Sequence, residues 1–258
     1  MTPTREIQTV GYPVKTRVLR VTATTMLAPK LKSIVLSGPE LEGFQSGSPD
    51  DHIKCFFPLD AGGPVVPRLG PDGIQFPEER AKPAMRDYTP VRFDPAKQEL
   101  ELIFFLHEAG PGTDWAKAAE PGSELVIGGP RGSRIVPYNF DWYLMIGDET
   151  AIPAFARRLR EMPRDARAEV LIEVQNDAMS VPLEHGPNVN VHWIQRLDAR
   201  PGDPTRIQSA IKVLPFPKGD YFAWVIGEST AVKSTAELLR TQFGAQKEWM
   251  KVTGYWDL

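Results

Sequence analysis

The stretch MRDYTPVR, residues 85–92, decides how the first half of the chain is interpreted. In an extended strand alternate side chains share a face, so Arg86, Tyr88 and Arg92 would lie together. A guanidinium donates paired, charge-assisted hydrogen bonds that suit phosphate oxygens, and a tyrosine ring offers a flat surface for stacking. The stretch therefore fits a surface that holds an anion beside a flat ring. It also fits an ordinary half-exposed strand, because aromatic and β-branched residues are common in strands anyway.

Composition is that of a soluble globular protein and argues against several functions. The 258 residues are 41% hydrophobic and 24% charged, enough for a substantial core in one large domain or two smaller ones. A formal net charge of -3 gives no reason to expect nucleic acid or an anionic membrane as a partner. The single cysteine, Cys55, excludes an intrachain disulfide, and no apolar stretch approaches the length of a membrane span. We therefore expect a cytoplasmic protein.

Short alternating segments separated by prolines and glycines dominate the chain before residue 140. They predict an antiparallel barrel, because most of the 25 prolines fall in this half and proline suits edge strands and turns. We expect residues 1–16 to form a mobile or loosely docked arm and residues 60–84 a long surface loop. The six predicted strands are residues 16–25, 31–37, 52–58, 85–92, 99–107 and 121–133.

After residue 140, continuous apolar runs alternate with stretches of helical spacing. The first of these helices has Thr150 as its expected cap and Pro153 in its first turn. Strands that alternate with helices imply a parallel sheet with right-handed crossovers. The predicted strands are residues 142–147, 168–174, 189–194 and 221–226, and the predicted helices are residues 152–162, 205–213 and 229–243.

Three glycine-containing turns lie where a helix is expected to begin, at residues 110–115, 147–153 and 227–230. Glycine allows close backbone approach, and the free amides at a helix start accept phosphate. The last two turns follow predicted parallel strands, whose carboxyl ends are where open α/β sheets bind ligands. An ordinary capped helix would look the same in each case, so the residue pattern leaves both interpretations open.

The motifs R-x-Y-T at residues 86–89, G-x-x-T-x-W at 110–115 and G-D-E-T-A-I-P at 147–153 occur in this order. Together they resemble the siderophore-interacting protein family of flavin-dependent ferric-chelate reductases, from about residue 18 to residue 256. The resemblance implies a ferredoxin-reductase-like fold. Its parts would be a six-stranded antiparallel FAD-binding barrel in residues 1–138 and a Rossmann-like, parallel-sheet NAD(P)H-binding domain in residues 139–258, with the C-terminal segment at the flavin.

The resemblance also assigns roles to individual residues. Arg86 would pair with the pyrophosphate of FAD, Tyr88 would stack on its ring or ribityl chain, and Thr89 would contact the ring near N5. Lys54 would attract an anionic chelate with help from Lys251, although a solvated lysine on a strand explains Lys54 equally well. No catalytic side chain and no protein-bound metal are expected, because the cofactor carries the chemistry. The cofactor-binding set is Arg86, Asp87, Tyr88, Thr89, His107, Gly112, Thr113, Asp114, Trp115, Asp148, Thr150 and Glu228.

The chain departs from the family at several positions. Asp148 and Glu149 stand where related reductases prefer small residues, which weakens the case for tight pyrophosphate binding. Asp257 replaces the basic residue of the family's G-Y-W-R ending, so the chelate must be attracted by other lysines. Glu228 would either position a nicotinamide or cap a helix. No cation follows the strand that ends near residue 175, so NADH, NADPH and a redox-protein donor all stay open.

The function implied by the resemblance is FAD-dependent reduction of a ferric siderophore. Electrons from NADH or NADPH would pass through FAD to Fe(III), and the resulting Fe(II) would leave the chelate. Two alternatives remain: a flavin reductase whose acceptor is a quinone or a redox protein, and a non-catalytic binder of ferric siderophore. We expect a monomer whose partner is a ferric siderophore, without nucleic acid or membrane partners.

Overall fold

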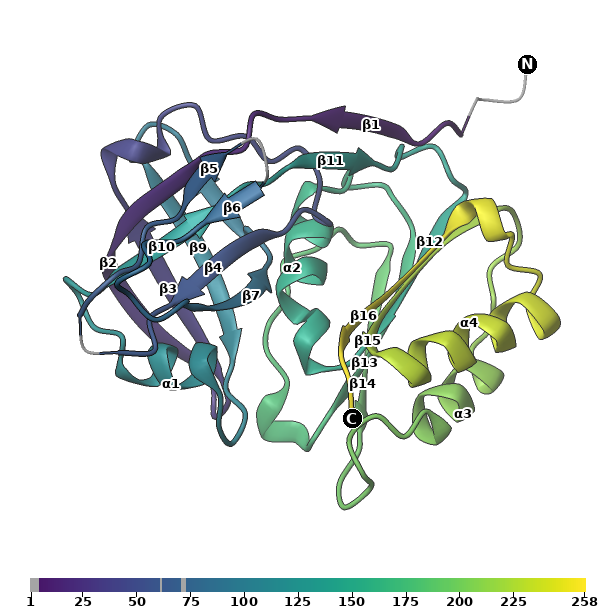
Figure 1. The fold of residues 1–258 in the computed structure, drawn as a ribbon. Coiled ribbons are helices and arrows are strands. Elements are labelled where there is room, and N and C mark those ends of the chain that lie inside the picture. The colour runs from purple at the N-terminus through teal and green to yellow at the C-terminus, as the bar shows by residue number, and fades with distance from the viewer. Residues whose placement is uncertain (1–4, 61, 71–72) are drawn as a thin grey trace. The chain divides into compact units, whose positions relative to one another are not determined.

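The computed structural model describes residues 5–60, 62–70 and 73–258 (Figure 1). Two compact units make up this part of the chain. One is Ile7–Val136, and the other combines residues 5–6 with Pro137–Leu258. The predicted boundary, between residues 138 and 139, lies two residues further along the chain, and residues 5 and 6 were predicted with the first domain.

The first unit is built around a seven-stranded antiparallel sheet with the order β7-β4-β10-β2-β3-β9-β8. Two short ribbons accompany it, β1 paired with β11 and β5 paired with β6. The elements are β1 (Gln8–Gly11), β2 (Thr16–Ala28), β3 (Leu31–Ser37), η1 (Pro39–Leu41), β4 (Ile53–Phe57), β5 (Arg68–Gly70), β6 (Gly73–Gln75), β7 (Ala84–Tyr88), β8 (Arg92–Asp94), β9 (Glu99–Phe105), α1 (Pro111–Ala118), β10 (Glu124–Gly128) and β11 (Gly132–Ile135).

Strands β7 and β8 are neighbours in sequence but lie at opposite edges of the sheet. Residues 89–91 alone join them, and a chain of that length spans at most about 14 Å between Tyr88 and Arg92. The two edges must therefore lie close together, which curls the sheet into a barrel whose open seam is crossed by this link. The Tyr88 ring contacts the Phe104 ring of β9, with centroids 4.2 Å apart.

This seam corrects the prediction of a single strand over residues 85–92. The strand ends at Tyr88, two residues before Pro90, which has no amide to donate to a strand ladder. Arg92 starts β8 and pairs with Glu101, so it does not share a strand face with Arg86. The sheet consequently has seven strands where six were predicted, while the antiparallel barrel itself is confirmed.

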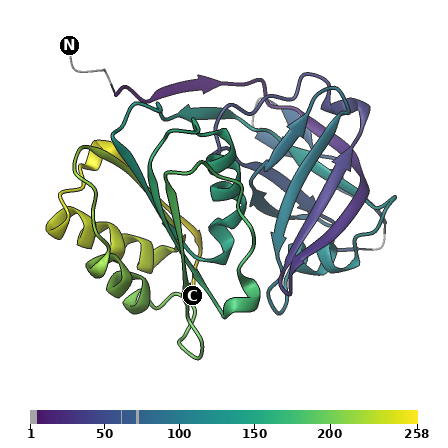
Figure 2. The ribbon, with the colours of Figure 1, turned by 180° about the vertical axis from the view of Figure 1, so that it is seen from behind.

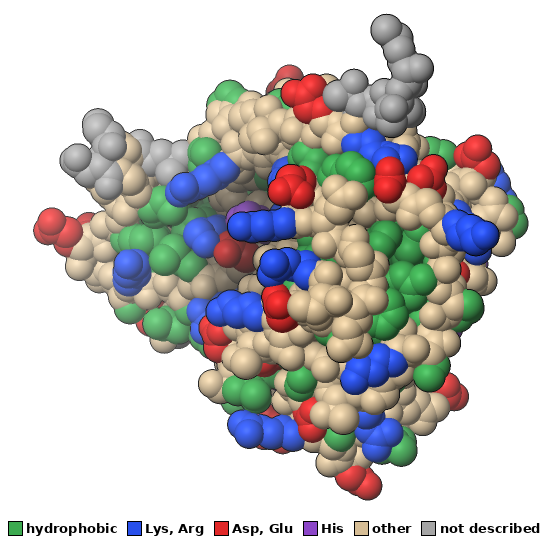
Figure 3. All heavy atoms as spheres, turned by 90° about the vertical axis from the view of Figure 1, so that its right-hand side faces the viewer, with side chains coloured by type: hydrophobic (Ala, Val, Ile, Leu, Met, Phe, Trp, Pro, Cys, Tyr) green, Lys and Arg blue, Asp and Glu red, His purple; other side chains and the backbone are tan. Residues whose placement is uncertain are grey.

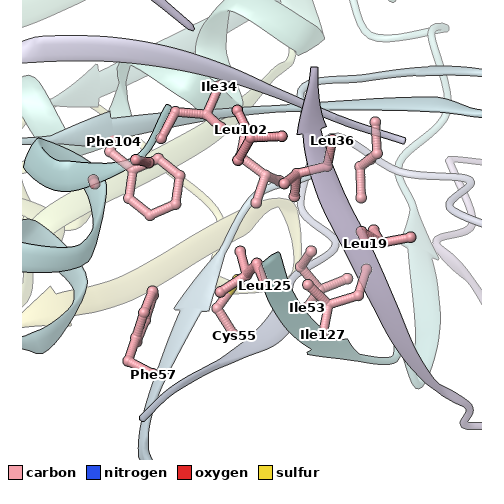
Figure 4. Packing of buried hydrophobic residues seen from close by; sticks show 14 of the residues in the cluster. Leu19, Ile34, Leu36, Ile53, Cys55, Phe57, Leu102, Phe104, Leu125 and Ile127 are labelled. Atoms are coloured by element: carbon pink, nitrogen blue, oxygen red, sulfur yellow. The ribbon is translucent and has the colours of Figure 1, made fainter. Parts of the chain in front are cut away.

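Alternate residues of the barrel strands form its hydrophobic core (Figure 4). On β4, for example, Ile53, Cys55 and Phe57 belong to the core and are at most 1% exposed. Burying an aliphatic or aromatic side chain of this size contributes roughly 1.5–3 kcal/mol, so the cluster is the main force that holds the strands together. The other core residues labelled in Figure 4 are Leu19, Ile34, Leu36, Leu102, Phe104, Leu125 and Ile127.

Two segments predicted to lack regular structure are partly ordered. Within the predicted arm, Arg5 forms ion pairs with Asp141 and Asp220, and β1 forms a ladder with β11. The predicted loop at 60–84 contains the β5–β6 hairpin. The arm is held by long-range pairing and the hairpin by three local residue pairs, and strands this short show no periodicity in the sequence. Residues 1–4, 61, 71 and 72 lie outside the described residues.

The second unit contains a five-stranded parallel sheet with the order β14-β13-β12-β15-β16. Helix α2 covers one face of this sheet, and α3 and α4 cover the other (Figures 1 and 2). Its elements are β12 (Trp142–Gly147), η2 (Glu149–Ala151), α2 (Ile152–Glu161), β13 (Ala168–Val174), η3 (Asp177–Met179), β14 (Val189–Gln195), α3 (Thr205–Val213), β15 (Tyr221–Glu228), α4 (Ser229–Gln242), η4 (Lys247–Trp249) and β16 (Met250–Trp256).

Burial explains which strands of this sheet could be predicted. Every residue of β12, β13 and β15 is buried, which accounts for their continuous apolar runs. The edge strand β16 was not predicted, because it mixes lysine, threonine and glycine with exposed positions and has β15 as its one neighbour. The parallel sheet that follows the barrel is confirmed.

Candidate functional site

The start of α1 is the first part of the candidate site. Gly110 precedes the helix with φ 142°, a conformation that glycine adopts without strain, and no side chain in the described part of the chain caps this end. The amides of Gly112 and Thr113, in the first turn, have no acceptor within the helix, and Thr113 is 1% exposed. Such an end carries partial positive charge and free donors, so it can accept an anion.

Tyr88 and His107 lie against the two glycines of this turn. A Cβ atom on Gly112 would collide with Tyr88 Oη, and one on Gly110 would lie 2.9 Å from His107 Cε1. Asp114 is also in the first turn, is exposed, and accepts a long hydrogen bond of 3.4 Å from the Gly110 amide. The structure thus brings together the residues predicted from R-x-Y-T and G-x-x-T-x-W, and glycine is required where they meet.

An aromatic cluster supports the Tyr88 ring. Phe57 lies 6.0 Å from it, and Trp115 of α1 lies 5.8 Å from Phe57, all between ring centroids. Burial raises the pKa of the Tyr88 hydroxyl, and the charge of Arg86 opposes this shift only in part. Tyr88 is therefore a neutral, fixed ring beside the uncapped helix start.

The β4–β7 pair places the predicted residues on two faces. Arg86 lies opposite buried Cys55, donates to the Met85 carbonyl at 2.8 Å, and has no carboxylate partner within the described residues. Asp87 lies opposite Lys54 and accepts a hydrogen bond from its Nζ at 2.8 Å. The structure therefore pairs Asp87 with Lys54 and does not bring Lys54 to the face of Arg86. Thr89, which is 9% exposed, follows β7 directly.

A pocket opens on the Lys54 side of the barrel wall. His52, Lys54 and Arg131 supply basic groups to it, and Phe56 and Ile74 supply apolar surface. Arg131 was not predicted. The signal that could have revealed it is the G-P-R-G run after β10, in which an arginine directly follows the glycine-rich end of a strand. The pocket suits a ligand that combines anionic and apolar groups. Its full lining is Val14, Thr16, His52, Lys54, Phe56, Ile74, Gly128, Gly129 and Arg131.

In the second unit, Asp148 occupies the turn that follows β12. Its carboxylate accepts hydrogen bonds from the amide of Thr150 at 2.8 Å, from the hydroxyl of the same residue, and from Nε1 of Trp256 at 2.8 Å. Burial raises the pKa of Asp148 in spite of these bonds. The predicted cap was therefore wrong: Asp148 caps η2 and Thr150 is its partner, while Pro153 lies in the first turn of α2 as predicted.

Glu228 caps the helix that follows β15. Its carboxylate accepts hydrogen bonds from the amides of Thr230 at 2.8 Å and Ala231 at 2.7 Å. These bonds lower the pKa of Glu228. Of the two roles considered for this residue, helix capping is the one that the geometry displays.

A buried ion cluster joins the carboxyl ends of β12, β13 and β14. Glu149 accepts hydrogen bonds from the Arg196 guanidinium at 3.0 and 3.1 Å and from the Gln175 amide at 2.6 Å. Arg196 also pairs with Glu173 at 3.2 Å, and the second oxygen of Glu173 is buried without a partner among the described residues. Burial raises the pKa of Glu173. Sequence reasoning missed this cluster, because it depends on three strand ends meeting.

A second pocket lies at the ends of β12 and β15, where the strand order of the parallel sheet reverses. Such a switch point is the usual ligand site of an open α/β sheet. Among the described residues that line it, none is lysine or arginine, so its charge disfavours phosphate while its glycines permit close approach. The polar and glycine lining is Gly147, Asp148, Glu173, Gly202, Asp203, Gly227 and Glu228.

Lys251, predicted to bind substrate, lies on β16 opposite Trp224. Burial lowers its pKa to about 8. Its positive charge is therefore largely present at neutral pH and is lost under mildly alkaline conditions. Asp257 follows the strand and is exposed. On the face in Figure 3, acidic and basic side chains are interspersed, without one broad patch of a single sign.

Family models match both halves of the chain. A model described as the siderophore-interacting FAD-binding domain matches residues 20–134. A model described as siderophore-interacting protein matches residues 140–258. None of the helices in the described part of the chain combines the length and the apolarity that crossing a membrane requires.

Individual proteins are similar along nearly the whole length. The NADPH-dependent ferric-chelate reductase of Escherichia coli is 32% identical over 253 residues, which cover 96% of each chain. The ferric vibriobactin reductase of Vibrio cholerae is 31% identical over 95% of this chain and 89% of its own. The solved structure of a siderophore utilization protein from T. fusca is 35% identical, with a TM-score of 0.88 over 98% of this chain and 96% of that one.

Proposed function

The chain belongs to the siderophore-interacting protein family, and we propose that it is an FAD-dependent reductase of ferric siderophores that takes electrons from NADH or NADPH. The observation that carries the proposal is the uncapped start of α1 against Tyr88, whose strand also carries Arg86, an arginine without a carboxylate partner in the described residues. The names of the Escherichia coli and Vibrio cholerae relatives, both ferric-chelate reductases, support the reaction.

The residues of the barrel unit fit FAD. The diphosphate would meet the amides of Gly112 and Thr113, with Arg86 as its counter-charge. Tyr88, held by its aromatic neighbours, would stack on the ring or ribityl chain, and the Thr89 hydroxyl would approach the ring. His107, Asp114 and Trp115 would shape the turn rather than contact the reacting atoms, and Asp87 would act through its ion pair with Lys54.

Bound FAD would supply the redox chemistry, accepting two electrons from the donor and passing them one at a time to external iron. The chain's own residues then need no nucleophile. Tyr88 stays neutral because burial raises its pKa, and its ring is fixed by Phe104. Because Fe(II) binds hard oxygen ligands less strongly than Fe(III), reduction of the chelated iron favours its release.

We propose that the chelate binds at the pocket of His52, Lys54 and Arg131. The two cations would attract an anionic chelate, and Phe56 and Ile74 would contact its apolar parts. The ion pair between Lys54 and Asp87 offsets part of this charge. The accepted chelate would therefore carry modest rather than high negative charge.

The parallel-sheet unit is proposed to bind the nicotinamide donor at the pocket between β12 and β15. The carboxylates of Asp148 and Glu228 can accept hydrogen bonds from amide and hydroxyl groups of the donor. They disfavour phosphate, because they are negatively charged and already occupy the amides of the turns that they cap. Thr150 would act through Asp148, to which it donates. We expect weak, reversible donor binding and tight FAD binding.

We further propose that the protein is a monomer. We also propose that it is located in the cytoplasm, where dissolved NADH and NADPH are available. Sedimentation of the purified protein as a single 28.8 kDa species would support the monomer. A stable larger species at micromolar concentration would refute it.

The purified protein tests the central proposal. We expect a yellow preparation that loses its flavin absorbance under NADH or NADPH without oxygen and regains it when a ferric siderophore is added. A colourless preparation that cannot be loaded with FAD would refute the proposal. A preparation that binds the chelate equally well without flavin would instead identify a non-catalytic binder, and faster oxidation by quinone than by ferric chelate would identify a different acceptor.

A further inference from the structure

Lys32 occupies a core position of strand β3. Ile34 and Leu36, the next residues on the same side of the strand, are fully buried in the barrel core, as Figure 4 shows. Lys32 itself is only 9% exposed. A charge at such a position is unfavourable unless the protein supplies partners for it, so the identity of those partners indicates what the lysine does.

The partner of Lys32 is the C-terminal end of α1. Its Nζ donates to the carbonyl oxygens of Ala116 at 2.8 Å and Ala119 at 2.9 Å, with a longer contact of 3.4 Å to the carbonyl of Lys117. No carboxylate within the described residues forms an ion pair with it. The counter-charge of the ammonium is therefore the negative pole of the helix, together with its last unpaired carbonyls.

The turn before α1 is tied to the same helix. Lys117 Nζ donates to the carbonyl oxygens of His107 at 3.3 Å and Glu108 at 3.1 Å. The helix has eight residues and is about 12 Å long, so an anchor at its C-terminal end also sets the direction of its first turn. That first turn is where Gly112 lies against Tyr88 Oη.

We propose that Lys32 is a positioning residue for the diphosphate of FAD. It fixes α1 from inside the barrel so that the amides of Gly112 and Thr113 present a preformed anion site beside Tyr88. The inference rests on the proposed function, since it assumes that this helix start holds the cofactor. It adds a residue that touches no part of FAD and acts entirely through the helix.

The test compares Lys32→Met with a core variant of equal stability. Leu36→Ala or Leu36→Val, whichever matches the melting temperature of Lys32→Met, lies on the same face of β3 four residues away. For each purified protein we would measure the Kd for FAD by fluorescence quenching and amide hydrogen exchange across the apoprotein. Lys32→Gln, which keeps a donor without the charge, provides a milder substitution if Lys32→Met does not fold.

We expect Lys32→Met to raise the Kd for FAD by about tenfold to a hundredfold relative to the matched Leu36 variant. Exchange should quicken in residues 111–118 and stay unchanged in the strands. Equal loss of FAD affinity in the Leu36 variant, or unchanged exchange in α1, would overturn the inference. A native protein that binds no FAD would refute the proposed function itself, which is a separate outcome.

Discussion

The helices that begin at the two candidate sites differ in what occupies their first amides. At α1 of the barrel unit no side chain of the described residues caps the start, and Arg86, two residues before Tyr88 on β7, has no carboxylate partner among them. In the parallel-sheet unit, Asp148 and Glu228 already accept hydrogen bonds from the amides that a phosphate would need. The start of α1 therefore has free amides for an external anion. In the parallel-sheet unit the carboxylates of Asp148 and Glu228 already occupy the corresponding amides.

This difference suits a tightly bound cofactor at α1 and a reversibly bound substrate in the parallel-sheet unit. An anion at α1 gains donors that are otherwise unpaired within the helix, whereas an anion at the start of η2 or α4 would have to displace a carboxylate and face its charge. The contrast supports tight binding of FAD and weak binding of the nicotinamide donor. Four substitutions would break or sharpen this comparison.

The largest effect is expected from Gly112→Ala. The new methyl group would collide with Tyr88 Oη and push the ring away from the helix start. The purified variant should retain no FAD through gel filtration, as judged by flavin absorbance. Gly11→Ala is the control, because a Cβ on Gly11 meets open space. If Gly112→Ala folded and kept its flavin, the helix start would not be the FAD site.

Arg86→Ala should be the next most severe change. Losing charge-assisted hydrogen bonds to phosphate costs about 1.5–3 kcal/mol, which corresponds to about a tenfold to hundredfold higher Kd for FAD. Isothermal titration calorimetry of the apoprotein would measure it. Arg92→Ala is the matched control, since that arginine lies on β8. Equal losses in both variants would mean that Arg86 acts only through general charge.

Lys251→Met tests whether the ammonium group of Lys251 is held in a desolvated position in the parallel-sheet unit. Burial lowers the pKa of Lys251 to about 8, so the folded protein binds fewer protons than the unfolded one between about pH 8 and about pH 10.4. The native protein should gain stability relative to Lys251→Met as pH rises through this window, by roughly 3 kcal/mol. Urea denaturation at several pH values would measure the difference.

The exposed Lys233→Met variant provides the control for this series, because a solvated lysine should give a flat difference across the same pH range. A flat difference for Lys251→Met as well would show that its ammonium is not held in a desolvated position.

The smallest effect is expected from Glu228→Ser. Serine keeps a helix cap and removes the charge, so NADP+ should bind roughly two- to fivefold more tightly at low salt, with the gain fading as ionic strength rises. Equilibrium dialysis would measure it. Glu237→Gln, an exposed charge change on the same helix, should leave the affinity unchanged. Weaker binding by Glu228→Ser would indicate that Glu228 contacts the donor directly.

Periodicity was sufficient to predict both parts of the fold. Alternation marked β3 and β4, and continuous apolar runs marked β12, β13 and β15, because burial on one or two faces leaves a direct trace in the residue order. The motifs also predicted the group of residues around Gly112. Helix caps were harder: Asp148 and Thr150 can both cap a turn, and the choice depends on backbone angles that the sequence does not reveal.

What could not be predicted depends on pairing between distant segments. The stretch 85–92 alternates like one strand, but its two halves join opposite sheet edges, and alternation does not distinguish these cases. Arg131 and Arg196 were missed because their partners come from other strand ends or loops. Lys32 is visible in the sequence as a cation that alternates with two core residues. Its role became clear only from the structure, in which its ammonium group donates to a carbonyl of α1.

The short link between Tyr88 and Arg92 has a mechanical consequence. A backbone cut within residues 89–91 would sever no strand ladder, since both flanking strands keep their partners β4 and β9. It would nevertheless remove the tether that limits how far the two rims of the curled sheet can separate. A protein cleaved there should keep its secondary structure, but the edge strands β7 and β8 could move apart. Tyr88, the last residue of β7, would lie next to the opening.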